Sequence, residues 1–508
     1  MKDDSVRIIK TIAISGIATI ISYLINFFLT PYITDTVGIE AYGFVSIAKT
    51  ATSYAQIFTI ALTTFVVRYI TLSYHQGKTE KANAYYSSSL VAALVIAGVI
   101  YFIAAIAVFN LEHLLVIPNA LIISVKALFL LIFLNFVLTV LITPLQAGAY
   151  IKNHLDYTGI LRIISYLIEV IALVALFKII QPEVWVVGFG TAISALFLFL
   201  GNIILKSKLV PELKFEKKLV SLAKVKEMMS NGIWQSINSL GNVLNSGLDL
   251  LISNLMLTGV ETGQIAVAKT IETMFSSLYQ MVSQPFQPRM LKAYSTGNMD
   301  VFVKELQIAM KVCGYFSNVA FAGFVTLGWK YFQLWLPSQN TDTLYNLAII
   351  TIFTSITAGC VYPLFYVNTL TLKKKIPCLV TVASGILNTI FMFILLKYTN
   401  LGSYAIVLTT AVLMTAIYVV FTPIYAARCL QISVKRIYVV YIWHFISAFL
   451  MIVFFEIIAK IANVNSWIQL ILCALFMSGV GLIIHAMVMT SMNEKRSILR
   501  KIFRGKYS

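Results

Sequence analysis

Charged side chains are scarce in this sequence, and their scarcity excludes a water-soluble protein. Asp, Glu, Lys and Arg make up 11% of the 508 residues, whereas an average soluble domain carries about 25%. Hydrophobic residues make up 59%, which is more than a soluble core needs. The composition therefore indicates a protein that is embedded in a membrane.

Motifs for several kinds of chemistry are also missing. The five cysteines form no C-x-x-C pair, so neither a metal site nor a disulfide framework is predicted. The sequence has no G-x-x-x-x-G-K-[ST] phosphate loop, so we do not expect the chain to hydrolyse ATP itself. If the chain moves a substrate across the membrane, the transport has to be driven by an ion gradient, by the membrane potential or by consumption of the substrate. No cofactor is expected beyond a coupling ion, H⁺ or Na⁺.

Long apolar runs recur from one end of the chain to the other. About 20 apolar residues form a helix long enough to cross roughly 30 Å of hydrocarbon. We therefore predict an all-α integral membrane protein with about 14 transmembrane helices. The predicted segments are 10–32, 43–70, 83–109, 121–148, 158–178, 184–205, 229–257, 263–288, 306–328, 343–369, 377–396, 403–427, 437–459 and 467–489.

The basic residues give the predicted orientation of these helices. If both termini lie on one side, 31 of the 38 Lys and Arg fall on that side, four on the other side and three within helices. An excess of Lys and Arg marks the cytoplasmic side, so both termini are predicted to be cytoplasmic. The net charge of +18 is thus explained by topology and by contact with anionic lipid headgroups, and no nucleic acid is expected as a partner.

The two halves of the chain resemble each other. The segment 38–43 with Ala48-Lys49-Thr50 recurs as 259–263 with Ala268-Lys269-Thr270. Arg68 with Gly77 recurs as Arg289 with Gly297, and Pro144 recurs as Pro363, all at offsets of 219 to 221 residues. Six helices separate the equivalent segments, so the sequence predicts two parallel lobes of six helices each. The predicted parts are an N-lobe (1–206), a basic cytoplasmic linker (207–228), a C-lobe (229–430), and helices 13 and 14 with a basic cytoplasmic tail (431–508).

Four predicted helices carry polar stripes at helical spacing, and they occupy equivalent places in the two lobes. A polar side chain in lipid is costly unless it faces another helix or a wet cavity, so the stripes predict a cavity between the lobes. The alternative is that these side chains only join helices. The stripes comprise Thr11, Ser15, Thr19, Ser22, Asn26 and Thr30; Lys49, Ser53, Gln56 and Thr63; Asn231, Gln235, Asn238, Asn242, Asn245, Asp249 and Ser253; and Lys269, Glu272, Thr273, Ser276, Gln280, Ser283 and Gln287.

The charged members of the stripes suggest an anion site. Lys49 and Lys269 lie inside helices at equivalent places in the two lobes, and two cations facing one cavity suit a phosphate or an acidic sugar. Snorkelling of both lysines to the interface is the alternative. The predicted substrate-binding residues are Lys49, Lys269, Arg68, Arg289, Gln56, Asn242, Asn245 and Gln280. Candidates for ion coupling are Asp249, Glu272 and Glu169, with pairing of Glu272 to Lys269 as the alternative for Glu272. Arg68 and Arg289 could equally be ordinary cytoplasmic anchors.

These features resemble the Wzx-type flippases, the polysaccharide transporter branch of the multidrug/oligosaccharidyl-lipid/polysaccharide superfamily. The resemblance rests on the segment 38–43, the Arg68 to Gly77 and Pro285 to Gly297 segments, and the layout of two six-helix lobes plus two helices. It implies a fold like that of the multidrug (MATE) transporters. It also implies flipping of undecaprenyl-pyrophosphate-linked oligosaccharides to the outer leaflet by alternating access, for capsule, O-antigen, exopolysaccharide or teichuronic acid synthesis. The implied setting is the bacterial cytoplasmic membrane, and the protein is expected to be a monomer that works beside a polysaccharide polymerase.

Two other functions remain open. A cation-coupled multidrug antiporter would have the same fold, but such proteins usually have twelve helices and bind cations. A membrane glycan polymerase or ligase would need positioned acids and bases in sizeable outer loops, whereas the predicted outer loops hold about 5 to 14 residues. Because these loops hold His113 and a few acids without paired carboxylates, we expect no enzymatic activity.

Overall fold

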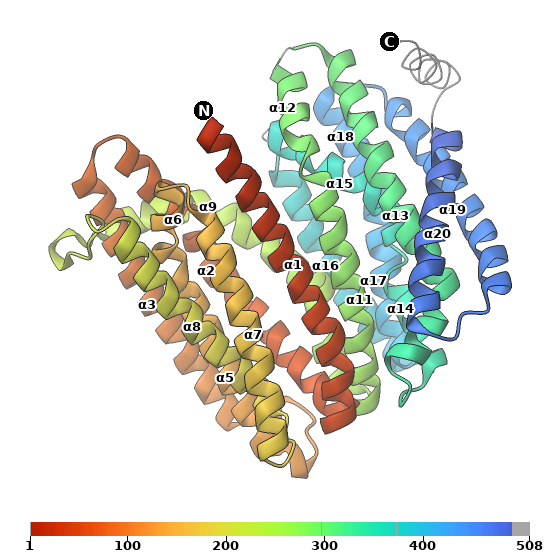
Figure 1. Cartoon of the computed structure of the whole chain (residues 1–508), viewed down its shortest axis with the longest axis horizontal. Coiled ribbons are helices and arrows are strands. Elements are labelled where there is room, and N and C mark those ends of the chain that lie inside the picture. Colours follow the sequence, from red (N-terminus) through yellow and green to blue (C-terminus); the bar gives the residue numbers. More distant parts are fainter. Residues whose placement is uncertain (1, 296, 372, 490–508) are drawn as a thin grey trace. The chain divides into compact units, whose positions relative to one another are not determined.

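The structure, a computed structural model, describes residues 2–295, 297–371 and 373–489, with the backbone alone at 2–13, 15, 16, 19 and 231 (Figure 1). Throughout these residues every regular element is a helix, as predicted. Helices dominate because lipid offers no hydrogen bonds, so a spanning segment must pair its own N–H and C=O groups. The predicted side chains Thr11, Ser15, Thr19 and Asn231 lie outside the described part, as does the predicted tail at 490–508.

Eleven helical segments among the described residues are long and apolar enough to cross a membrane, so the chain is a multi-pass membrane protein. The predicted segments 10–32, 229–257 and 263–288 are also helical but more polar or less fully described, so the count of fourteen stays a prediction. The eleven segments are Ile39–His75, Thr79–Phe109, Asn119–Ile151, Leu155–Ile179, Trp185–Leu209, Met299–Trp335, Thr341–Leu370, Lys375–Tyr398, Ser403–Leu430, Lys435–Ala462 and Trp467–Met489.

The helices group into two compact units. Unit 1 comprises Met1–Ala266 with Cys378–Lys397, and unit 2 comprises Val267–Pro377 with Tyr398–Ser508. The units reflect which helices contact one another, and they do not coincide with the predicted lobes. Residues 229–266 and 378–397, predicted to belong to the C-lobe, are grouped with the N-terminal helices. The lobe boundaries at 206 and 229 therefore stay a prediction about the repeat.

Unit 1 is a bundle in which α2 packs against α3, α5 and α9, while α8 packs against α5 and α7, and α1 packs against α7. A π-helical turn at Val243–Gly247 joins α9 to α10. The main elements of the unit are α1 (Lys2–Val37), α2 (Ile39–His75), α3 (Thr79–Phe109), α4 (Leu111–Leu114), α5 (Ile122–Leu145), α6 (Ala147–Ile151), α7 (Leu155–Ile179), α8 (Trp185–Leu209), α9 (Leu222–Asn242), α10 (Asp249–Met256), the start of α11 (Gly259–Ser283) and most of α16 (Lys375–Tyr398).

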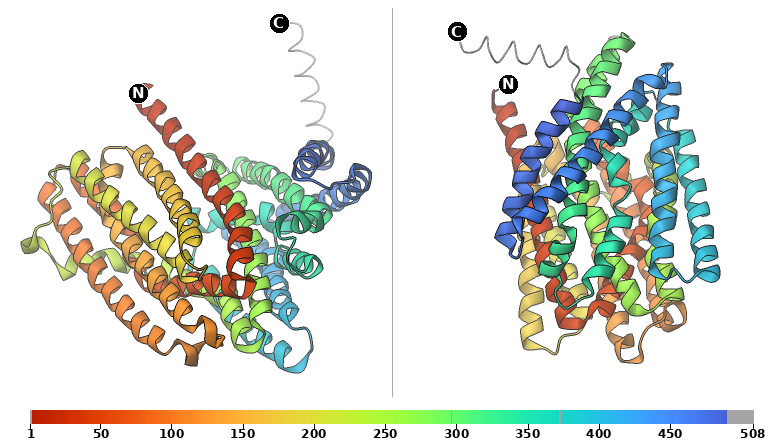
Figure 2. Two further views of the ribbon diagram at one scale, coloured as in Figure 1. Left: turned by 60° about the horizontal axis from the view of Figure 1, so that its bottom comes forward. Right: turned by 90° about the vertical axis from the view of Figure 1, so that its right-hand side faces the viewer.

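Unit 2 is built around the long helix α13, which packs against α15, α19 and α20. Figure 2 shows α19 and α20 side by side along this helix. Two buried histidines join these helices. His444 on α19 contacts the carbonyl of Ile356 on α15, and His485 on α20 lies 2.8 Å from the carbonyl oxygen of Lys311 on α13. The elements are α12 (Phe286–Ser295), α13 (Met299–Trp335), α14 (Thr341–Thr351), α15 (Ser355–Leu370), α17 (Ser403–Ala416), α18 (Thr422–Leu430), α19 (Lys435–Ala462) and α20 (Trp467–Met489).

The predicted repeat has the same local structure in both copies. Gly77 and Gly297 have φ angles of 74° and 72°, and each stands two residues before a helix, α3 and α13 respectively. The N–H of Gly77 donates to the carbonyl of Tyr74, and that of Gly297 donates to the carbonyl of Tyr294. A positive φ is favourable for glycine, so this turn accounts for the glycine in each copy.

Two further glycines allow helix backbones to touch at the start of the repeat. A Cβ on Gly43 would lie 3.2 Å from the backbone nitrogen of Gly263, and a Cβ on Gly263 would lie 2.2 Å from the carbonyl oxygen of Ile39. The start of α11 therefore packs directly against the start of α2 within unit 1. Any larger side chain at 263 would collide with backbone, which cannot rotate away.

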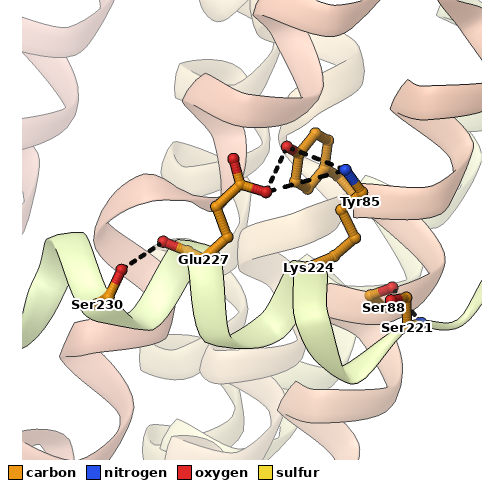
Figure 3. A network of polar contacts seen from close by, with 6 residues as sticks. All are labelled: Tyr85, Ser88, Ser221, Lys224, Glu227 and Ser230. Carbon is orange, nitrogen blue, oxygen red and sulfur yellow. Dashed lines mark hydrogen bonds and ion pairs between the residues drawn. The ribbon is translucent and has the colours of Figure 1, made fainter.

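The predicted basic linker is an ordered segment fixed to α3 and α9 (Figure 3). On α9, Glu227 accepts a hydrogen bond of 2.8 Å from the hydroxyl of Tyr85, and Lys224 lies 4.5 Å from the centre of the Tyr85 ring. At the end of the linker the N–H of Ser221 donates to the hydroxyl oxygen of Ser88 over 2.9 Å. These contacts tie the linker and the start of α9 to the N-terminal part of α3.

Candidate functional site

Unit 1 encloses a polar cavity among α1, α2, α5, α7 and α8. Its volume is about 500 Å³, which is within the range of small-molecule sites. Each helix presents polar residues to it at helical spacing. The polar lining comprises Ser22, Asn26, Lys49, Thr52, Gln56, Thr59, Thr63, Asn135, Thr139, Thr143, Arg162, Ser165, Tyr166, Glu169, Thr191 and Ser194. A hollow of this polarity among membrane-spanning helices is suited to a hydrophilic ligand, because lipid cannot satisfy such groups.

Two cations and one carboxylate line this cavity. Lys49 comes from α2, while Arg162 and Glu169 come from α7. Arg162 and Glu169 are seven residues apart, so they lie on one face of α7, about 10 Å apart along its axis. Lys49 is exposed to the cavity and interacts electrostatically with Glu169. The cavity therefore carries a net charge of about +1 when all three groups are ionised, and it favours anions.

The hydroxyl groups around the cavity present mainly acceptor oxygens to a ligand. Thr52 donates its proton to the carbonyl of Lys49, Thr63 to that of Thr59, and Thr139 to that of Asn135, over 2.6 to 3.2 Å. A hydroxyl that donates to its own helix still has lone pairs free to accept. Sugar hydroxyl groups are donors that such a surface can bind.

Predicted site residues in unit 2 form pairs of their own. Lys269 lies 3.9 Å from Glu272 on the same face of α11, so the charge of Lys269 is partly offset. Arg289 on α12 contacts Glu305 on α13 at 2.9 Å, which joins these two helices. Gln280 is exposed on α11 and makes a side-chain hydrogen bond to Tyr362. A shared site for Lys49 and Lys269 involves both units and stays a prediction.

Asn245 has structural contacts with α16 in unit 1. Its amide donates to the carbonyl of Thr381 over 2.7 Å, and its side-chain oxygen accepts from the hydroxyl of Ser384 over 2.9 Å. It is 2% exposed and lies within the π-helical turn. These bonds use both the donor and the acceptor of the side chain, which turns Asn245 toward a neighbouring helix.

The other predicted residues of unit 1 differ in exposure. Arg68 and Asn242 are exposed on α2 and α9. Asp249 is buried where α10 follows the π-helical turn and interacts electrostatically with Tyr54. Tyr54 in turn donates to the carbonyl of Gly247 over 2.7 Å. Asp249 thus lies in a packed contact between α2 and α10, while Lys49, Gln56 and Glu169 lie around the cavity.

The cavity also contains residues that the sequence analysis did not single out. Arg162 counts as a cytoplasmic cation in the predicted topology, yet it lines the cavity with Ser165, Tyr166 and Glu169. Ser165, Tyr166 and Glu169 follow Arg162 by three, four and seven residues, a spacing that places all four on one face of a helix. This pattern can be recognised in the sequence. Asn135 on α5 donates to the carbonyl of Thr191 on α8 over 2.7 Å and so joins two walls of the cavity.

Comparison with known proteins identifies the family. The family model described as "Polysaccharide biosynthesis protein" matches residues 8–293, more than half of the chain. The chain belongs to this family. EpsK of Bacillus subtilis (strain 168), described as an uncharacterized membrane protein, is 28% identical over 493 residues, covering 96% of this chain and 97% of EpsK. The family resemblance predicted from the sequence is confirmed.

Solved structures confirm the predicted fold. An inward-facing multidrug resistance MATE family transporter of the MOP superfamily has a TM-score of 0.68 at 11% identity, over 84% of this chain and 99% of that one. The lipid II flippase MurJ in an inward closed conformation has the same TM-score at 13% identity, over 93% and 98% of the two chains. This member of the polysaccharide biosynthesis family thus has the same fold as these two membrane proteins.

Proposed function

We propose that this chain flips an undecaprenyl-pyrophosphate-linked oligosaccharide from the cytoplasmic to the outer leaflet of a bacterial cytoplasmic membrane. The observation that carries the proposal is the cationic, hydroxyl-lined cavity inside unit 1. Membership of a polysaccharide biosynthesis family supports a glycan substrate, and the fold shared with a lipid II flippase supports a lipid-linked one. Capsule, O-antigen, exopolysaccharide or teichuronic acid synthesis would use such a product.

The cavity divides the binding of this substrate between two kinds of groups. Lys49 and Arg162 bind the anionic part, either the pyrophosphate or an acidic sugar, and the fork of the guanidinium can hold two oxygens at once. Hydroxyl oxygens such as those of Thr63 and Thr139 accept bonds from sugar hydroxyl groups. The undecaprenyl tail stays in lipid while the head crosses. Arg68, Arg289, Lys269, Asn242 and Gln280 remain proposed contacts along the rest of the route.

Glu169 gives the cavity a means of ion coupling. As a carboxylate it attracts Lys49 and so competes with an anionic substrate for that ammonium. Protonation of Glu169 removes the competition and leaves Lys49 for the substrate. Binding of H⁺ and binding of the anionic head are therefore linked, and alternating access would turn this linkage into coupled movement. Asp249 and Glu272 stay alternative coupling groups, and Na⁺ the alternative ion.

A multidrug antiporter of the same fold is disfavoured by the charge of the cavity. A site with Lys49, Arg162 and one carboxylate repels the cationic compounds that such an antiporter would export. The remaining parts of the proposal, namely cytoplasmic termini, a monomer, and cooperation with a polymerase, rest on the distribution of basic residues and on the family.

Reconstitution into vesicles tests the proposal. A fluorescent undecaprenyl-pyrophosphate oligosaccharide is incorporated, and the amount that becomes accessible on the far leaflet is measured. We expect transport by wild type and at least a tenfold loss in Lys49→Gln and in Arg162→Gln, since each removes a charged hydrogen bond worth about 1.5–3 kcal/mol. Lys178→Gln, which removes an exposed charge outside the cavity, is the matched control and should transport normally.

Two results would count against the proposal. Unchanged transport in the double variant Lys49→Gln/Arg162→Gln would refute the role of the cavity. Absence of transport by a folded wild type, together with ion-driven export of a cationic dye, would favour the multidrug antiporter instead.

A further inference from the structure

A second hollow of unit 1 is an apolar groove that the proposed function does not use. It lies among α3, α5, α8 and the linker, and its volume is about 430 Å³. Its walls are aliphatic and aromatic, with Leu90, Leu94, Leu141, Phe199 and Ile203 among them. Leu94 is 61% exposed, so the groove is open along its side. In a membrane-spanning bundle an open apolar groove is suited to a hydrocarbon chain.

The groove ends in a cationic group, at the end of α8 that is predicted to be cytoplasmic. Lys206, near the C-terminal end of α8, lines the groove together with Ser207. The ammonium of Lys206 lies 5.0 Å from the centre of the Tyr86 ring and is affected electrostatically by Lys214. Within the described residues no carboxylate lies within 4.0 Å of either ammonium. Lys206 in the groove thus interacts with a second cation, Lys214, which precedes the groove residue Phe215 on the linker, and neither has a protein counter-ion within this distance.

The linker is fixed in the position that completes this groove. Asn83 accepts a hydrogen bond from the N–H of Lys214 over 3.1 Å, and Ser87 accepts one from the N–H of Glu216 over 2.9 Å. Ser87 is fully buried. Between these two anchored residues, Phe215 lines the groove although it is 51% exposed. The apolar edge and the two lysines are thus parts of one ordered arrangement.

We propose that this groove binds an anionic phospholipid of the cytoplasmic leaflet. One acyl chain lies along the apolar walls, and the phosphate lies between Lys206 and Lys214 and accepts a bond from Ser207. The positive charge at the end of the groove favours an anionic lipid over a zwitterionic one. Basic pockets between membrane helices on the cytoplasmic side are a recurrent type of anionic lipid site. The small volume suits one acyl chain better than the much longer undecaprenyl tail.

Occupancy of this groove would act on the linker. The linker joins α8 to α9. Because the linker carries Lys214, the repulsion between Lys206 and Lys214 acts on its position, and a bound phosphate would offset this repulsion. Lipid binding should therefore stabilise the folded protein, because a ligand that binds the folded state alone raises the unfolding temperature.

Native mass spectrometry and thermal unfolding of the purified full chain test this site. Phosphatidylglycerol and phosphatidylcholine are titrated separately in the same detergent. We expect phosphatidylglycerol to be retained and to raise the unfolding temperature more than phosphatidylcholine does. In Lys206→Gln/Lys214→Gln, phosphatidylglycerol should bind about 25-fold more weakly, since each lysine near anionic lipid contributes roughly a fivefold gain in affinity.

Matched variants separate this site from general attraction to a basic surface. Lys208→Gln removes an exposed charge from the same end of α8 outside the groove and should leave binding unchanged. Lys206→Arg keeps the charge and should retain binding even if Lys206→Gln is unstable. Equal binding by the double variant and wild type would overturn the proposal. So would displacement of phosphatidylglycerol by equimolar undecaprenyl phosphate, which would assign the groove to the substrate.

Discussion

Asn245→Ala is expected to lower stability because its side chain joins two helices of unit 1. The substitution removes its bonds to the Thr381 carbonyl and to the Ser384 hydroxyl. Hydrogen bonds between membrane helices average about 0.6 kcal/mol and reach about 1.7 kcal/mol, so two of them amount to roughly 1–3 kcal/mol. The bond from Asn388 to the backbone carbonyl of Asn245 should survive, which keeps α16 in place.

Reversible unfolding in mixed micelles, followed by tryptophan fluorescence, measures this change. Asn242→Ala is the matched control, because Asn242 is exposed on the same polar helix and should unfold like wild type. Transport is measured in parallel at a temperature where both variants are folded. If Asn245→Ala were as stable as wild type yet transported poorly, Asn245 would contact the substrate and the structural explanation would be wrong.

Three further predictions concern other contacts. Gly263→Ala should reduce the yield of folded protein, since its Cβ would lie 2.2 Å from the carbonyl oxygen of Ile39. The control Gly98→Ala places its Cβ in open space, so in thermal unfolding it should be neutral or stabilising by up to about 1 kcal/mol. Gly314→Ala should destabilise by about 1–3 kcal/mol because its Cβ would lie 2.8 Å from Nδ1 of His444; an unchanged unfolding temperature would contradict this. The hydrogen bond from Lys126 lowers the pKa of Glu112 below 4.5, so this contact stabilises the protein above that pH and is lost as the pH falls through the lowered pKa. Between pH 5 and 3, as measured by thermal unfolding, Lys126→Gln should therefore lose less stability than wild type.

Much of the fold follows from the sequence because its signals are strong and local. The predicted apolar segments are helical over nearly all of their length, with short turns at 146, 284–285 and 352–354, since a helix is the form that satisfies the backbone in lipid. The turns at Gly77 and Gly297 have the same conformation, which agrees with the predicted repeat. The grouping of helices into compact units was less predictable, because it depends on contacts such as that between α2 and α9.

The candidate site was predictable in part. Lys49, Gln56 and Glu169 do line one cavity, but Arg162 on α7 was missed because it was counted with the basic residues of the loop before that helix. Asn245 was placed on a continuous stripe that assumes 3.6 residues per turn. The π-helical turn at Val243–Gly247 widens the spacing and shifts the faces of the helix that follows, so the stripe breaks where Asn245 meets α16.

The contact between Gly43 and Gly263 bears on how the chain arose. These glycines are counterparts in the repeat at an offset of 220 residues, the same offset as Lys49 and Lys269. In a symmetric homodimer the same surface patch serves both subunits, so a residue meets its own copy at the symmetry axis. Gly43 and Gly263 have this relationship within one polypeptide. If the predicted repeat arose by duplication, an interface between two identical ancestral subunits would have become this internal contact when their genes fused.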